Sequence, residues 1–298
     1  MINRPFNQYQ HIQRFGRADD AYKMSSIIMK ICYITAIYGN YESTCKPFIN
    51  QSVPSDFICF TDNIKLISNG WTIDTTPYHI TNKSPLDDDT YDNSISNNKH
   101  TFNIAKYYKQ QFQNIPLLKE YDAIVWLDGT IKITNPNTSK YILEKLQKYK
   151  IVGWMHEHRS GILQNEVLAS NFNRYTSTNW NNQDQPYQDI FKQHDDYIKD
   201  GYTDDFVKQS DVINDFNKEH IGVWLTCFVA FSNKDKDTSR FLNFWYLQTL
   251  RYTTQDQISF PYVCYKTNIT PYTLPDENIK GSTPHILTDF YEKLDHGK

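Results

Sequence analysis

The chain has 298 residues, which is enough for one large domain or two small ones. Its formal net charge is −3 and its pI is about 6.3, a balance that does not favour a protein bound to nucleic acid through phosphate contacts on a basic face. The 5 cysteines include no Cys-x-x-Cys pair, which argues against a zinc ribbon or a redox motif.

The N-terminal part of the chain is polar. Residues 1–24 lack the apolar core of a signal peptide, so we expect a polar extension there and a single domain over 25–298. The apolar run 27–37 is too short to span a bilayer, and Lys30 and Thr35 interrupt it. These features predict a cytoplasmic protein without a transmembrane segment, and they leave its oligomeric state open.

Strand-like and helix-like segments alternate along the domain. β-branched and aromatic residues predict strands at 29–39 and 55–63. The polar residues 81–100 predict a solvated loop. Apolar side chains at helical spacing then predict a helix over about 101–114.

The second half of the chain continues this alternation. The expected elements are a strand at 122–127, a helix at 139–150, a strand at 151–158, a helical stretch inside the polar segment 171–215, a strand at 220–233 and a helix at 238–252. Residues 253–259 are expected to form a loop or the start of a helix, and the last forty residues are expected to be loop-like. Strands that alternate with helices predict an α/β fold with a mostly parallel sheet flanked by helices.

An acidic residue, Asp128, directly follows the apolar strand 122–127, and Gly129 comes next. Ligands of open α/β sheets bind beyond the carboxyl ends of the strands. We therefore expect Asp128 to meet a ligand, or a metal bound to one, and Gly129 to leave room for its close approach. The chain has no glycine-rich phosphate motif, so a nucleotide would need a metal, cationic side chains or both.

Two histidines end the predicted strand 151–158. His156 and His158 alternate with Glu157, so on this strand both imidazoles are expected to point to the same side. They could form half of a metal site with Glu166, or His158 and Arg159 could bind a sugar or a phosphate.

Seven local strings carry a family resemblance when they are taken in order. They are TAIYGNYE at 35–42, CFTDN at 59–63, Gly70-Trp71, YDAIVWLDGTIKI at 121–133, HEHR at 156–159, YIKDGY at 197–202 and NFWYLQTLRYTTQDQISFPYV at 243–263. This ordered set resembles a GT-A glycosyltransferase, and more specifically the glycosyltransferase-like family tied in plants to mucilage synthesis. The last string departs from that family, because Gln255 stands where the family has arginine.

The resemblance implies a GT-A-like domain that moves a sugar from a nucleotide-sugar donor to a hydroxyl of a glycan or other acceptor. Because GT-A enzymes commonly use UDP-sugars, the resemblance implies a UDP-sugar as the donor. The end of the first strand, Thr35, Ala36 and Tyr38, would hold the base and the ribose. Asp62 would accept hydrogen bonds from the nucleoside.

The resemblance also places the acidic metal motif of GT-A enzymes on Asp128. The usual second carboxylate is replaced by Thr130, whose hydroxyl is a weak ligand for a divalent cation. Either Asp128 binds Mn²⁺ or Mg²⁺ with help from elsewhere, or the metal is dispensable. Several GT-A families supply a late histidine, and His285 is the candidate here; otherwise it is an ordinary loop residue.

Further residues could serve the transfer itself. Lys106 and Lys109 share one helix face and could meet the diphosphate, or could simply be solvated. The acceptor hydroxyl needs a base, for which Asp256 is the candidate, although an aspartate there could equally cap a helix. Gln257 would contact the donor sugar. Two rival functions remain, a hydrolase on the same scaffold and a non-catalytic carbohydrate- or protein-binding module.

Overall fold

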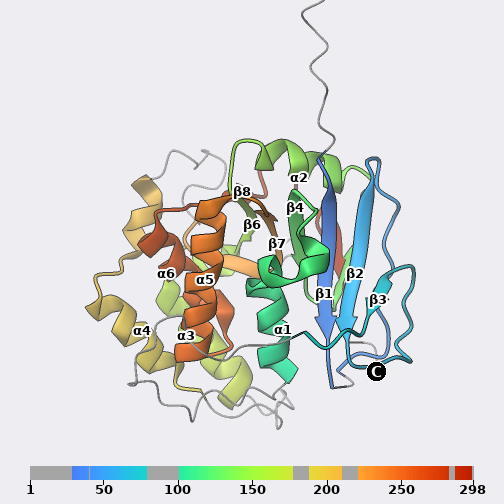
Figure 1. Cartoon of the computed structure of the whole chain (residues 1–298). Coiled ribbons are helices and arrows are strands. Elements are labelled where there is room, and N and C mark those ends of the chain that lie inside the picture. Colours follow the sequence, from blue (N-terminus) through green and yellow to red (C-terminus); the bar gives the residue numbers. More distant parts are fainter. Residues whose placement is uncertain are drawn as a thin grey trace, which may run out of the picture.

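The structure, a computed structural model, describes residues 29–39, 41–78, 101–176, 188–209, 221–281 and 286–296. Its centre is a seven-stranded sheet (Figure 1). The strands are β1 Ile31–Ile37, β2 Ser55–Thr61, β3 Thr72–Asp74, β4 Ala123–Leu127, β6 Ile151–Met155, β7 Trp224–Ser232 and β8 Tyr272–Leu274. They lie in the order β3-β2-β1-β4-β7-β6-β8. Only β7 runs antiparallel to its neighbours, β4 and β6; the other adjacent pairs are parallel.

Six α-helices accompany the sheet in the described ranges. They are α1 Thr101–Gln110, α2 Thr138–Leu146, α3 Leu163–Asn171, α4 Ile190–Lys199, α5 Lys236–Arg251 and α6 Asp256–Thr267. Aspartates start two of them, because the side chains of Asp189 and Asp235 accept backbone N–H groups of the first turns of α4 and α5. None of the helices in these ranges combines the length and the apolar content that a membrane span requires.

The core has a layer on each face of the sheet, because alternate residues of each buried strand point to opposite sides. In β1, Cys32 and Ile34 pack into one layer with residues of α1 and α5. Tyr33 of the same strand packs into the other layer, with residues of α2. Figure 1 shows α1 and α5 in front of the sheet, and α2 near its upper edge. The predicted α/β fold with a mostly parallel sheet flanked by helices is therefore confirmed.

A third apolar cluster joins the helices that stand beside the sheet. Leu163 and Val167 of α3, Ile190 of α4 and Ile258 of α6 are all buried in it. Tyr197 of α4 also belongs to this cluster. This packing holds α6 in place, and α6 carries one of the predicted site residues at its first position.

A small second sheet begins just after β4 in the chain. It pairs β5, Ile131–Ile133, with β9, Tyr291–Lys293, in antiparallel register. The prediction that the last forty residues are loop-like is wrong, since they contain most of α6 together with β8 and β9. The predicted helix over 101–114 ends at Gln110, and a 3-10 turn follows at Phe112–Asn114.

Candidate functional site

A cavity of about 200 Å³ lies at the carboxyl ends of β1 and β4. Ala36 and Tyr38 from the end of β1 line it, as do Lys106 of α1 and Asp128 after β4. The structure thus brings four of the predicted site residues together in one cavity. Gly129, directly after Asp128, lines the same cavity.

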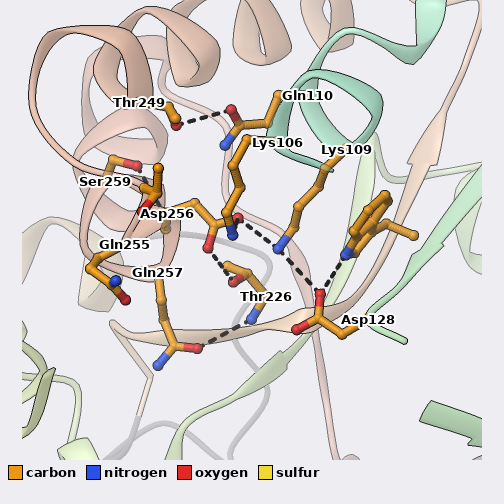
Figure 2. Close-up of polar contacts among 12 residues, drawn as sticks. Lys106, Lys109, Gln110, Asp128, Thr226, Thr249, Gln255, Asp256, Gln257 and Ser259 are labelled. Atoms are coloured by element: carbon orange, nitrogen blue, oxygen red, sulfur yellow. Dashed lines mark hydrogen bonds and ion pairs between the residues drawn. The ribbon is translucent and has the colours of Figure 1, made fainter. Parts of the chain in front are cut away.

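Asp128 presents a carboxylate to this cavity. Its backbone N–H donates to the carbonyl of Cys227 at 2.8 Å, which ties it to the neighbouring strand β7. Its Oδ1 accepts the indole N–H of Trp126 at 2.7 Å and lies 3.8 Å from Nζ of Lys109 (Figure 2). The side chain remains 45% exposed, so it can still meet a ligand.

Behind the cavity, the two lysines of α1 converge on one buried carboxylate (Figure 2). Nζ of Lys106 lies 2.8 Å, and Nζ of Lys109 2.6 Å, from Oδ2 of Asp256. The hydroxyl of Thr226 donates to the other oxygen, Oδ1, at 3.0 Å. Asp256 does not cap its helix, because Gln255 occupies the N-cap position and the carboxylate is engaged by these other groups.

The two ammonium groups determine the protonation state of Asp256. Burial by itself raises the pKa of this carboxyl, but the charges of Lys106 and Lys109 outweigh burial, so that its pKa is about 2. The carboxylate is 4% exposed and stays ionised at neutral pH. A group so acidic and so fully paired is better suited to holding the lysines in place than to accepting a proton.

The two lysines differ in their access to the cavity. The side chain of Lys109 is 1% exposed and lies between the rings of Trp126 and Trp245, with Nζ 5.5 Å from each ring centre. The side chain of Lys106 is 17% exposed and lines the cavity. Burial lowers the pKa of Lys106 below its ordinary value, and the charge of Asp256 opposes that shift only in part.

Three other predicted site residues, Thr35, Asp62 and Gln257, do not line the cavity. Thr35 is 3% exposed and sits within β1. Asp62 is exposed after β2, and its carboxylate accepts the backbone N–H of Gly39 at 3.2 and 3.3 Å. Gln257 uses its side-chain oxygen to accept the backbone N–H of Thr226 at 3.4 Å. His285 lies outside the described residues.

The predicted pair of histidines on one strand face is wrong. Strand β6 ends at Met155, and residues 157–159 form a 3-10 turn, so His156 and His158 do not alternate on a strand. Their ring centres are 6.2 Å apart. Glu166 instead pairs with Nε of Arg159 at 2.6 Å and accepts the hydroxyl of Ser170 at 2.9 Å.

Several cavity residues were not predicted from the sequence. Lys293 and His296 come from the C-terminal segment, and Arg174 comes from the π-helical turn Phe172–Thr176. Nδ1 of His296 is hydrogen-bonded to the carboxylate of Glu42, which also lies 3.3 Å from Nζ of Lys46. Gln255, noted only as a departure from the family pattern, lines the cavity too.

The described residues are a poor fit for the expected Mn²⁺ or Mg²⁺. Over the ranges that the structure covers, no three His, Cys, Asp or Glu side chains gather into a group that could hold a metal ion. Asp128 offers a single exposed carboxylate beside an ammonium group, and the hydroxyl of Thr130 belongs to a residue only 5% exposed. Divalent cations of this kind prefer several oxygen ligands.

Comparison with known proteins adds no family assignment. No protein-family model matches the chain, and no curated protein matches it either.

Proposed function

We propose that the protein is a nucleotide-sugar-dependent glycosyltransferase with a GT-A-like domain. The observation that supports this best is the cavity beyond β1 and β4. Ala36, Tyr38, Lys106 and Asp128 line it together, and the family resemblance assigns these residues to the donor. The position agrees with the general preference of ligands for the carboxyl ends of strands in open α/β sheets. A UDP-sugar is the donor we expect.

In this reaction the bond between the anomeric carbon and the diphosphate breaks, and its electron pair stays on the diphosphate. The acceptor oxygen forms the new bond to that carbon and loses its proton. Lys106, held by Asp256 at the cavity wall, would stabilise the negative charge that develops on the leaving group. A fixed cation does this with little reorganisation, because Asp256 already orients it.

The acceptor hydroxyl requires a group that can take its proton. Asp256 is buried and paired with two lysines, whereas Asp128 is the half-exposed carboxylate of the cavity. We therefore assign the proton of the acceptor hydroxyl to the carboxylate of Asp128, which would accept it as the new bond forms. Asp256 becomes a positioning residue, and Gln257 supports β7 through its hydrogen bond to Thr226.

A melting screen tests the binding step. UDP or GDP should raise the melting temperature, since a ligand at a hundred times its dissociation constant adds about 2.7 kcal/mol of stability. No melting shift with any nucleotide would favour the non-catalytic module. In a separate product assay, free sugar released from the donor without an acceptor would indicate the hydrolase.

The variant Asp128→Asn tests the catalytic step. Turnover, measured as nucleoside diphosphate released from the donor with acceptor present, should fall by about a hundredfold or more. The fold should survive, because the amide oxygen of asparagine can still accept the indole N–H of Trp126. Asp237→Asn, an exposed carboxylate on α5, is the matched control. Unchanged turnover in Asp128→Asn would remove this residue from the mechanism.

A further inference from the structure

We propose that this cavity neutralises the diphosphate of its nucleotide with the cationic side chains of Lys106, Lys293 and Arg174, in place of a divalent metal ion. The inference rests on the proposed function, since it concerns the same site and the same class of ligand. It follows from how the carboxylates and the cations of the site are distributed.

The carboxylates near the cavity are already engaged by the protein's own cations and donors. Asp256 binds two lysines, at 2.6 and 2.8 Å. Glu42 is 1% exposed, lies 3.3 Å from Nζ of Lys46 and is hydrogen-bonded to His296. Neither carboxylate can join Asp128 as a ligand without giving up these partners, which would leave buried charges unpaired.

Asp128 itself has a cation beside it. Its Oδ1 accepts the indole N–H of Trp126 and lies 3.8 Å from the buried ammonium group of Lys109. A divalent cation on this carboxylate would be repelled by that ammonium group, and the ion pair of Lys109 with Asp256 offsets only part of the repulsion. The arrangement suits a carboxylate that accepts hydrogen bonds from hydroxyls better than one that binds a metal.

The cations of the cavity come from three separate parts of the fold. Lys106 extends from α1, Lys293 stands at the end of β9, and Arg174 belongs to the turn after α3. All three line the cavity together with the carboxylates of Asp128 and Glu42, so the cations of the lining outnumber its carboxylates. A guanidinium group adds paired hydrogen bonds to phosphate oxygens, and ammonium groups add charge.

The test measures nucleotide binding to the full chain in two ways, from the shift in melting temperature and from the dissociation constant obtained by titration. UDP and GDP are compared in excess EDTA and in excess Mn²⁺ or Mg²⁺. We expect the same melting shift and the same dissociation constant, within about twofold, in both conditions. Binding that appears only with the metal overturns this inference but leaves the proposed function standing, whereas no binding in either condition overturns both.

The variant Lys293→Gln tests the cations separately from the metal. Lys293 is exposed, so the fold should survive its replacement. Loss of one charge-assisted hydrogen bond should weaken UDP binding in EDTA by about tenfold. Lys140→Gln on α2, another exposed lysine that does not line the cavity, is the matched control and should bind like the wild type.

A second variant, Arg174→Gln, keeps the test decisive if the loss of Lys293 alone has little effect on binding. Binding in EDTA that both Lys293→Gln and Arg174→Gln leave unchanged would overturn the assignment of the diphosphate to these cations. Weaker binding in either of them, with an unchanged Lys140→Gln control, would support it.

Discussion

Gly129 provides the most direct residue-level test of how closely a ligand approaches Asp128. A Cβ added there would lie 3.5 Å from Cγ of Glu42 and 3.7 Å from Cγ1 of Ile37, which are ordinary van der Waals contacts. Gly129→Ala should therefore fold with nearly the wild-type melting temperature. Its added methyl group lies at the cavity wall and should weaken UDP binding by about tenfold, an effect of roughly 1.4 kcal/mol.

The control for this variant is another glycine of the sheet. A Cβ at Gly153 would meet Cδ1 of Trp224 at 3.4 Å, and Gly153 does not line the cavity. Gly153→Ala should leave UDP affinity unchanged in the same titration. If Gly129→Ala also bound UDP as the wild type does, the ligand would not approach this position.

Asp256 should matter mainly for the stability of the fold, because its carboxylate is the buried partner of Lys106 and Lys109. Asp256→Asn leaves the buried ammonium group of Lys109 without its carboxylate partner and should cost about 3–5 kcal/mol of unfolding free energy, the typical cost of breaking a buried pair. Urea denaturation measures this loss. Asp237→Asn, whose carboxylate is 53% exposed and 3.6 Å from Arg240, should lose at most about 1 kcal/mol.

The ion pairing of Asp256 also predicts how the free energy of unfolding changes with pH. The pKa of Asp256 is about 2 in the folded chain, whereas an unfolded aspartate has a pKa of about 3.9. The ionised carboxylate therefore stabilises the fold above a pH of about 4, and this contribution, roughly 2–3 kcal/mol, is lost as the pH falls from about 4 toward about 2. The stability difference between wild type and Asp256→Asn should narrow over that interval; a constant difference would contradict the pairing.

How much of the site the sequence could reveal depends on how local each signal is. Asp128 was predictable because it directly follows a buried apolar strand, and Lys106 because it lies on an amphipathic helix. Lys293 gave no such signal, since it reaches the cavity only through the pairing of β9 with β5. Strands of three residues are too short for an alternation pattern to be recognised.

The elements show the same dependence on length. The five predicted strands are all present, with ends that differ from the prediction by up to four residues. The strand predicted over 151–158 stops at Met155, where the backbone turns, and that difference removes the alternation expected for His156 and His158. The short strands β3, β5, β8 and β9 were missed because tertiary contacts, rather than local pattern, define them.

At the level of the element, the pairing of β9 with β5 can be tested by the stability of a variant in β9. Tyr291 of β9 is fully buried, and its ring stacks on Phe228 with centres 5.4 Å apart. Tyr291→Ala should lower the unfolding free energy by about 3–5 kcal/mol, as for other large aromatic core residues. It should also weaken UDP binding, because β9 carries Lys293 to the cavity.

The matched control, Tyr291→Phe, keeps the ring and should change stability by no more than about 1 kcal/mol. Urea denaturation and UDP titration of the two variants together separate the ring packing from the hydroxyl. If Tyr291→Ala lost stability yet bound UDP with wild-type affinity, β9 would not form part of the binding site.

At the scale of the whole molecule, the antiparallel strand β7 connects the two halves of the site. Its Thr226 donates to Asp256 of α6, and its Cys227 accepts the backbone N–H of Asp128. Strand β7 therefore sets the position of the exposed carboxylate relative to the buried one. Lys109 of α1 then links the two carboxylates, since its Nζ lies 3.8 Å from Oδ1 of Asp128 and 2.6 Å from Oδ2 of Asp256. Contacts thus connect α1, β4, β7 and α6 around the cavity.

The net charge of the whole molecule has the opposite sign to the three cationic side chains of the cavity lining. The chain carries a formal net charge of −3, whereas Lys106, Lys293 and Arg174 bring positive charge to the cavity wall. If the cavity binds an anionic nucleotide as proposed, local cations would hold it against weak long-range repulsion. Raising the salt concentration from about 0.1 to about 1 M shortens the Debye length from about 10 to about 3 Å and screens mainly the exposed cations, of which Lys293 is one.

UDP binding should therefore weaken several-fold over this range of salt. Uridine, which lacks the phosphates, should bind with an affinity that does not change, and it serves as the matched ligand for the same calorimetric titration. Lys293→Gln should show a smaller salt effect on UDP than the wild type, because one screened contact is already missing. An affinity for UDP as independent of salt as that for uridine would show that charge does not hold the phosphates, and the cavity would then have to recognise its ligand through the nucleoside alone.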